Sequence, residues 1–230
     1  MRLAPARYRG IEYLDDRSVS ADLRRRSLRD VARANTLLGG AHAVLAELDR
    51  VLPGAGSRCT LLDVGTGLGD LPRRAQRRAG RRGVDLVPIG CDVSPAVLKE
   101  GSRCAAAGDA LALPFRSRSV DVVVCSQLLH HFEFPDARRV LRELDRVARR
   151  AVIVSDLRRS WIAAGGFWLV SWLLGFHAIT RHDGVTSVRR GFTAGELAAM
   201  VREATGADAH VSRHPGYRLT ARWAATGSAA

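Results

Sequence analysis

One stretch near residue 65 combines residue types that suit the binding of a nucleotide-like small molecule. An apolar run, Leu61-Leu62-Asp63-Val64, leads into Gly65-Thr66-Gly67-Leu68-Gly69-Asp70, so three glycines spaced two apart precede a carboxylate. In an open α/β sheet, the first turn from strand to helix is where such a ligand meets backbone N–H groups. Glycine permits both the tight turn and the close approach. The spacing therefore predicts a ligand site at residues 65–70.

The carboxylate that ends this run constrains the charge of the ligand. A dinucleotide site of the Gly-x-Gly-x-x-Gly type needs glycine at position 70, where this chain has Asp70. A carboxylate there would face the pyrophosphate that a helix N-terminus attracts. S-adenosylmethionine has the same adenosine but carries a sulfonium cation and an amino acid tail in place of phosphates, so Asp63 and Asp70 are tolerable or helpful. The sequence favours this ligand.

Polar residues at the ends of three more expected strands should converge on the same crevice. Asp92 lies about twenty residues beyond the glycines, where a carboxylate can accept both ribose hydroxyl protons. Asp109, next to Ala110, can accept from the adenine amine. Ser126 and Gln127 can hold the methionine end. A single Asp at a strand end is more often a helix cap, so the argument rests on the set.

Taken in order, these motifs closely resemble the class I S-adenosylmethionine-dependent methyltransferases, particularly the small-molecule branch that includes ubiquinone and menaquinone biosynthesis methyltransferases. The resemblance covers residues 59–156 and implies S-adenosylmethionine as the cofactor. One departure is that Arg149-Arg150 leads directly into residues 151–154, where the family usually has a Leu-x-Pro-Gly-Gly turn. The residues expected to bind the cofactor are Asp63, Gly65, Thr66, Gly67, Gly69, Asp92, Val93, Asp109, Ala110, Ser126 and Gln127.

Composition excludes several classes of protein. The 230 residues suit one domain with a small appendage, and 47% hydrophobic with 26% charged residues argues against global disorder. The net charge of +13 comes almost entirely from arginine, with Lys99 the single lysine, and it is scattered along the chain. Because the arginines are scattered, they are expected to lie on solvated helix faces and not to form a binding surface for an acidic or membrane-bound partner. No nucleic-acid partner is expected, because aromatic residues are not interleaved with the basic ones.

The cysteines and the N-terminus indicate a cytoplasmic protein. Cys59, Cys91, Cys104 and Cys125 are widely separated and form no Cys-x-x-Cys pair, which favours free thiols in a reducing compartment. No metal site is expected. Residues 1–5 lack the apolar core of a signal peptide.

Apolar periodicity predicts an α/β fold, a doubly wound and mostly parallel Rossmann-like sheet with an antiparallel closing strand and an N-terminal helical cap. The cap comprises residues 1–56, with helices at 21–34 and 42–51, and residues 57–230 form the cofactor-binding domain. Thr193 and Glu196 have the spacing of a capping box. The expected strands lie at 59–64, 85–91, 120–125 and 151–156, with a closing pair at 211–213 and 217–224.

Three histidines are candidates for a catalytic base. His130 and His131 follow the fourth strand, although one ring of such a pair often only packs or orients a loop. His182 lies beside Asp183 in a segment expected to be a loop over the crevice. A base is useful because a hydroxyl acceptor must lose its proton during methyl transfer.

Residues 161–179 hold three of the four tryptophans and are apolar on every side. We expect a helix, or two broken at Gly175, within an apolar lid at residues 157–192 that lines the acceptor pocket. Trp168, Trp172 and Arg181 are the expected substrate contacts. A membrane span is disfavoured, since it would place the last strands of the sheet on the opposite side of the membrane from the others. A peripheral membrane contact and a homodimer face are the alternatives.

These features favour a methyltransferase that acts on the oxygen of a hydrophobic small molecule, such as a phenolic, polyketide-like or quinone-precursor compound. C-methylation of a similar ring is the alternative enzyme, and a non-catalytic cofactor-binding module is the alternative outside enzymes. Nucleic-acid methylation is disfavoured, since no Asn-Pro-Pro-Tyr-like or paired-cysteine motif occurs.

Overall fold

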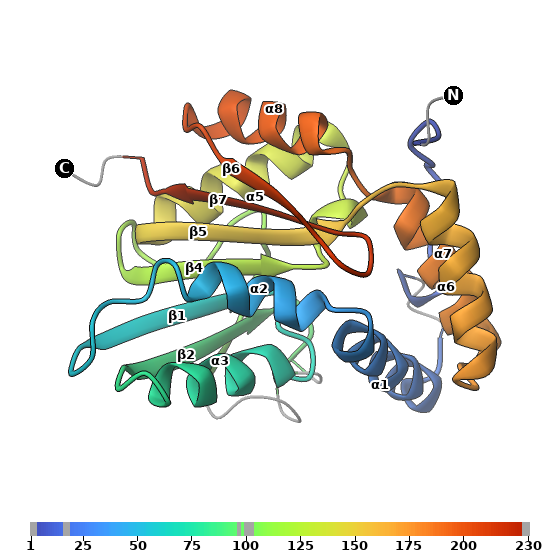
Figure 1. Ribbon diagram of the computed structural model, residues 1–230, viewed down its shortest axis with the longest axis horizontal. Coiled ribbons are helices and arrows are strands. Elements are labelled where there is room, and N and C mark those ends of the chain that lie inside the picture. The colour runs from blue at the N-terminus through green and yellow to red at the C-terminus, as the bar shows by residue number, and fades with distance from the viewer. Residues whose placement is uncertain (1–3, 16–18, 96–97, 99–103, 227–230) are drawn as a thin grey trace.

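The fold is built on one seven-stranded mixed sheet with the strand order β3-β2-β1-β4-β5-β7-β6 (Figure 1). The computed structural model describes residues 4–15, 19–95, 98 and 104–226. The strands β1 to β5 pair in parallel, and β7 closes the sheet antiparallel to β5 and β6. The strands are β1 (Arg58–Val64), β2 (Asp85–Asp92), β3 (Ala105–Ala107), β4 (Val120–Ser126), β5 (Ala148–Leu157), β6 (His210–His214) and β7 (Arg218–Ala224).

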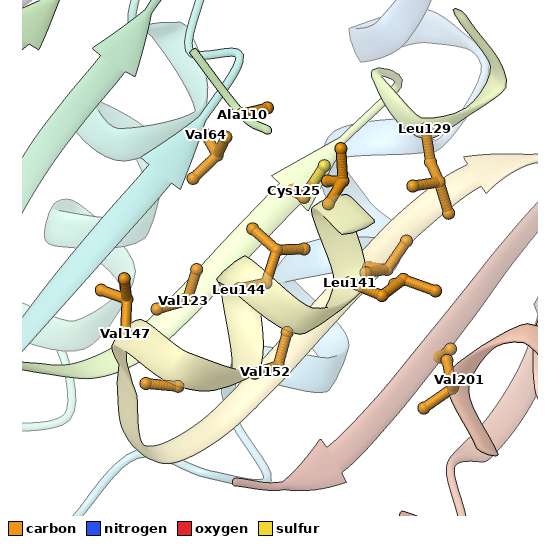
Figure 2. Packing of buried hydrophobic residues seen from close by; sticks show 14 of the residues in the cluster. Val64, Ala110, Val123, Cys125, Leu129, Leu141, Leu144, Val147, Val152 and Val201 are labelled. Carbon is orange, nitrogen blue, oxygen red and sulfur yellow. The ribbon is translucent and has the colours of Figure 1, made fainter. Parts of the chain in front are cut away.

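Helices cover both faces of the sheet, which is why its central strands are almost continuously apolar. Helices α2 (Gly40–Leu48) and α3 (Asp70–Gly80) pack on one face, and α5 (Phe134–Val147) and α8 (Ala194–Thr205) pack on the other. Figure 2 shows Leu141 and Leu144 of α5 among the strand residues Val123 and Val152. This double coverage confirms the doubly wound architecture.

Three further helices gather at one end of the sheet (Figure 1). They are α1 (Ala21–Leu37), α6 (Trp161–Leu173) and α7 (Ala178–Arg190), and α7 packs against both α1 and α6. A short helix η1 (Tyr13–Asp15) also lies against α7. The break between α6 and α7 falls at Gly175, whose φ of +65° favours glycine, so of the two expected forms the structure has two helices and not one.

The sequence predicted most elements, and the structure differs from it at β3 and at the start of β5. The capping box of Thr193 and Glu196 is present at the start of α8, and the closing antiparallel pair is confirmed. The short edge strand β3 was not expected. Strand β5 begins at Ala148, immediately after α5, so Arg149 and Arg150 lie inside the strand and no turn precedes it. This direct junction explains the departure from the Leu-x-Pro-Gly-Gly pattern.

Some expectations fall on residues that the structure does not describe. The expectation about a signal peptide concerned residues 1–5, of which residues 1–3 are not described. The helix expected after Ser94 extends into residues 96–103, of which only residue 98 is described. Among the described helices, none has both the length and the apolar character to cross a membrane.

Candidate functional site

A cavity of about 660 Å³ lies where the carboxyl ends of β1, β2 and β4 meet α1, α6 and α7. One part of its wall is polar and comes from the turn after β1 together with Asp92 and Ser126. Another part is apolar and includes Leu28 and Val31 of α1 and Phe167 and Val170 of α6. The cavity therefore joins the predicted cofactor site to an apolar chamber.

The turn after β1 needs glycine for two different reasons. Gly65, Gly67 and Gly69 all have positive φ, at +74°, +52° and +66°. A Cβ on Gly65 would lie 3.0 Å from Cδ2 of Leu128, whereas a Cβ on Gly67 would meet nothing within 4 Å. Because Gly67 also lines the cavity, its missing side chain leaves room for a ligand. Gly69 instead caps the N-terminus of α3 and is not among the lining residues.

The backbone amides of this turn already have partners within the protein. The amides of Gly65 and Thr66 donate to the carbonyl of Cys91 at 2.8 and 3.1 Å. The Gly67 amide donates to Oδ2 of Asp92 at 3.1 Å. A phosphate-binding turn would direct such amides at the ligand. The observed bonding thus agrees with a ligand that lacks phosphate.

Asp92 at the end of β2 ties this turn to the next loop and retains the capacity to bind a ligand. Its Oδ1 accepts from the amide of Ser94 at 3.0 Å, while Oδ2 accepts from Gly67. A carboxylate offers about four lone-pair sites, so two remain for a diol. Asp92 and its exposed neighbour Val93 both line the cavity, as predicted.

Three carboxylates make this part of the cavity suited to a cation. Asp63 is 2% exposed, and burial, reinforced by the charges of Asp70 and Asp92, raises its pKa from 3.8 to about 7. Oδ2 of Asp70 is buried without a hydrogen-bond partner among the described residues, and its nearest cation is Arg74, whose Nε lies 4.0 Å away. A sulfonium would relieve this crowding of negative charge, so the residues present fit S-adenosylmethionine.

The turn after β4 supplies the other expected cofactor contacts. Ser126 Oγ is buried and has no hydrogen-bond partner in the described part of the chain, which leaves it available to a ligand. Gln127 has a φ of +54°, and its Oε1 accepts from Nη1 of Arg218 at 2.7 Å. Both residues line the cavity.

Asp109 and Ala110 lie apart from the lining residues. Asp109 is exposed, and its Oδ1 accepts from the amide of Leu111 at 2.9 Å, as in a turn. Ala110 is buried in the core beside Val64 (Figure 2). The adenine role of this pair stays a prediction.

Two of the three candidate histidines line the cavity with a buried glutamate that the sequence did not point to. His130 Nε2 lies 3.7 Å from Oε1 of Glu12, and His131 Nε2 lies 3.9 Å from its Oε2. Glu12 and His130 are buried, while the His131 side chain is 29% exposed. We call Glu12, His130 and His131 the Glu-His-His cluster.

Asp156 at the end of β5 holds His130 from the other side. Its Oδ1 lies 2.7 Å from His130 Nδ1, and its Oδ2 accepts from the His130 amide at 3.0 Å. Burial would raise the pKa of Asp156, but His130 and the backbone amides outweigh burial and keep that pKa below its usual value. The His130 ring is therefore fixed, with Nε2 toward Glu12.

The structure corrects the expected loop around His182. Residues 181–183 lie within α7, because the helix begins at Ala178 and continues to Arg190. The His182 side chain is 49% exposed, its Nδ1 lies 3.0 Å from Oδ1 of Asp183, and it does not line the cavity. A catalytic role for His182 therefore has no support from the cavity geometry and stays a sequence-based prediction.

The expected substrate contacts also lie outside the cavity wall. Trp168 and Trp172 are 52% and 58% exposed, and neither lines the cavity. Arg181 stacks over the Trp172 ring, with Cζ 3.6 Å from the ring centre. The other face of α6, with Ala163, Phe167 and Val170, lines the cavity instead. The sequence could not assign these faces, since the helix is apolar all round.

Asp156 could have been found from its position at the carboxyl end of a parallel strand, where polar residues often bind ligands. Glu12 had no such signal. Ser187 Oγ donates to Oε1 of Glu12 at 2.7 Å. The two residues that follow Glu12 are fixed by Asp183, which accepts from the amides of Tyr13 and Leu14 at 2.9 and 3.0 Å.

Comparison with known proteins agrees with this geometry. Residues 62–154 match a sequence family described as a methyltransferase domain. None of the curated proteins matches the sequence significantly.

Solved structures with a similar fold include several methyltransferases. One is a SAM-dependent methyltransferase from Aquifex aeolicus, with 14% identity, a TM-score of 0.57, and coverage of 85% of this chain and 98% of that one. Magnesium protoporphyrin IX methyltransferase from Synechocystis PCC 6803 with bound SAH has 18% identity, a TM-score of 0.54, and coverage of 92% and 90%. A putative O-methyltransferase from Nostoc punctiforme PCC 73102 has 16% identity, a TM-score of 0.58, and coverage of 82% of this chain but 56% of that one.

Proposed function

Because residues 62–154 match a family described as a methyltransferase domain, we propose that this protein is an S-adenosylmethionine-dependent methyltransferase that acts on an oxygen of a hydrophobic small molecule. The observation that supports this most is the single cavity that joins the carboxylate-lined glycine turn to an apolar chamber containing the Glu-His-His cluster. An apolar wall with a few convergent polar groups is typical of small-molecule sites.

The chain's own residues account for cofactor binding in this proposal. Asp92 accepts hydrogen bonds from the ribose, Asp63 and Asp70 provide negative charge near the sulfonium, and the open space at Gly67 admits the ligand close to the backbone. The cofactor supplies a methyl group on a positively charged sulfur. Alignment of an acceptor oxygen with that methyl group can contribute about 7 to 11 kcal/mol to rate acceleration.

The acceptor would occupy the apolar part of the cavity. Leu28, Val31, Phe167 and Val170 remove the acceptor from water without hydrogen-bonding to it. An acceptor with an apolar ring or chain and one hydroxyl suits such a wall, and phenolic, polyketide-like and quinone-precursor compounds have this chemistry.

Removal of the hydroxyl proton is assigned to the Glu-His-His cluster. Its three side chains line the cavity, and Asp156 orients His130. A base positioned in this way contributes typically about 10²- to 10⁴-fold. We assign no such role to His182, whose ring does not reach the cavity wall.

The direct test is incubation of the purified protein with methyl-labelled S-adenosylmethionine and a panel of alkylated phenols, polyketides and quinone precursors. We expect label in an O-methyl product, and loss of about 10² in turnover in His131→Ala with cofactor affinity retained. Cofactor binding without transfer to any panel member would favour a non-catalytic module. A ring-carbon product would favour the C-methylation alternative, which uses the same deprotonated hydroxyl to activate the ring.

The outer face of α6 adds a proposal about where such a substrate is taken up. Its large apolar side chains are between 52% and 78% exposed. Arginine cations accompany two of its tryptophans, with Arg181 3.6 Å from the ring centre of Trp172 and Arg189 5.4 Å from that of Trp161. Exposed tryptophan beside arginine suits an anionic lipid surface. We propose that this face rests on such a surface.

Vesicle sedimentation tests this surface. We expect binding to vesicles of phosphatidylglycerol and phosphatidylcholine, weakened by salt and by Leu169→Asp. Leu37→Asp on α1 is the matched control, since Leu37 is 59% exposed and Leu169 55%. Equal binding of both variants, or a concentration-dependent dimer without vesicle binding, would refute the proposal, and the dimer would make the face an interface between copies.

A further inference from the structure

The Glu-His-His cluster has the composition and spacing of a metal centre. Glu12, His130 and His131 each offer one ligand atom, and these three atoms all lie within 4.8 Å of one another. Glu12 belongs to the N-terminal segment, whereas both histidines lie in the turn η2 (Leu129–His131) after β4. We propose that this cluster binds one divalent transition-metal ion, which holds the oxygen of the methyl acceptor.

The separations between the ligand atoms are somewhat longer than those in an occupied metal site. Bonds of about 2.0 to 2.2 Å from an ion to nitrogen and oxygen place neighbouring ligand atoms about 3.0 to 3.5 Å apart. The two histidine nitrogens lie 3.7 and 3.9 Å from the carboxylate oxygens of Glu12. All three ligand atoms lie within 4.8 Å of one another, so the cluster would have to contract by less than about 2 Å to hold an ion.

Surrounding residues hold the ligands as they do in known metal sites. A metal-binding histidine usually donates its other ring N–H to a carboxylate, which fixes the ring and its tautomer. His130 has this arrangement, since Nδ1 lies 2.7 Å from Oδ1 of Asp156 and Nε2 faces Glu12. Ser187 Oγ donates to Oε1 of Glu12 at 2.7 Å.

Two arginines lie near the cluster, and their positions leave one carboxylate oxygen of Glu12 to the ion. Arg7 Nη2 donates to the carbonyl of His130 at 3.0 Å. Arg190 Nη1 is 3.7 Å from Oε1 of Glu12, the oxygen that also accepts from Ser187. The other groups of Arg190 donate to the carbonyls of His130 and His131 at 3.1 and 2.7 Å. Oε2 of Glu12, which faces His131, is the oxygen we assign to the metal.

The donor set selects the class of ion. Two imidazole nitrogens and one carboxylate suit zinc, iron, cobalt or manganese, whereas magnesium prefers oxygen and water ligands. Three protein ligands leave coordination positions open, as catalytic zinc sites do. All three ligands line the cavity, so the open positions can face an acceptor there.

The role of the ion rests on the proposed O-methylation, although ion binding itself does not. With the ion bound, the cluster would promote proton removal through the ion and would not itself act as the base: a hydroxyl on the ion would lose its proton to solvent and keep the electron pair on oxygen. That oxygen would then form a bond to the methyl carbon as the bond from carbon to sulfur breaks. The ion keeps its charge throughout, so no oxidant or reductant is needed.

Zinc titration of the full chain without an affinity tag, followed by calorimetry, tests the proposal. We expect one tight site per chain, and a loss of affinity of at least tenfold in Glu12→Gln and in His131→Ala. Asp156→Asn, which changes a supporting residue, should lose about 10- to 100-fold. The matched control is His210→Ala, which removes an exposed histidine of β6 and should bind as the parent protein does.

Two further measurements separate this inference from the proposed function. Cobalt(II) should give a visible absorption band in the parent protein and His210→Ala, and zinc should raise the Tm of these two but not of Glu12→Gln. Zinc affinity that the cluster variants do not change would overturn the metal site, and methyl transfer that survives complete chelation would overturn the role of the ion in holding the acceptor oxygen. Tight zinc binding by a protein that methylates no acceptor would instead overturn the proposed function alone.

Discussion

The buried carboxylate of Asp63 should destabilise the protein increasingly as pH rises, and Asp63→Asn should remove that cost. The pKa of Asp63 is raised from 3.8 to about 7, first by burial and then by the charges of Asp70 and Asp92. Because a pKa difference of one between the folded and unfolded states changes the free energy of unfolding by about 1.4 kcal/mol, this rise corresponds to about 4 kcal/mol of unfolding free energy.

The sign follows from proton binding in the two states. Between pH 3.8 and about 7, the folded protein keeps a proton on Asp63 that the unfolded chain has released. The stability contributed by this group is therefore complete below pH 3.8 and is lost as pH rises through about 7. Relative to the parent protein, Asp63→Asn should gain about 2 kcal/mol in unfolding free energy between pH 5.5 and pH 8.

Urea denaturation followed by tryptophan fluorescence at the two pH values measures this difference. Asp85→Asn is the control for loss of a carboxylate, since the Asp85 side chain is 69% exposed. The difference in unfolding free energy between Asp85→Asn and the parent protein should be the same at both pH values. If Asp63→Asn shows no gain, or the same gain at both pH values, the reasoning about Asp63 is wrong.

Ligand binding gives a second test of the same carboxylate. A sulfonium near Asp63 favours its charged form, so S-adenosylmethionine binding near pH 7 should release protons. S-adenosylhomocysteine, whose sulfur is neutral, should release fewer. Calorimetry in buffers with different ionisation enthalpies counts these protons, and an equal count for the two ligands would contradict the assigned position of Asp63.

Four other variants test the remaining parts of the site. Asp92→Ala should weaken cofactor binding by about 1.5 to 3 kcal/mol in calorimetry, and unchanged affinity would mean that β2 does not hold the ribose. Gly67→Ala has a φ of +52° and open space for its Cβ, so strain should cost about 1 kcal/mol in urea denaturation while cofactor affinity falls further. His182→Ala should keep near-normal turnover, while His131→Ala loses about 10²-fold, and the reverse order would restore the sequence-based assignment.

Local sequence patterns were sufficient for the sheet and for the polar half of the site. Continuous apolar runs that alternate with helical periodicity predict parallel strands, and the carboxyl ends of such strands necessarily meet at one edge. Asp63, Gly67 and Asp92 line the cavity as expected, because each lies at or just after a strand end, where backbone geometry alone decides its position. The missing glycine at position 70 indicated the charge of the ligand.

Long-range packing decided the acceptor half, because its residues come from distant parts of the chain. Glu12 meets His130 across more than one hundred residues, and no periodicity or motif marks that contact. The apolar helix at 161–173 has no polar face to orient it, so only its packing decides that Phe167 faces the cavity and Trp168 faces outward.

The sequence by itself thus determined the sheet and the strand ends at which the expected cofactor-binding residues lie, since these depend on local backbone geometry. Only the tertiary structure decided three features. His182 lies within α7, the N-terminal segment brings Glu12 close to His130 and His131, and one particular side of α6 faces the cavity. Those outcomes depend on which apolar surfaces bury one another, and hydrophobic burial carries no direction that a linear pattern records.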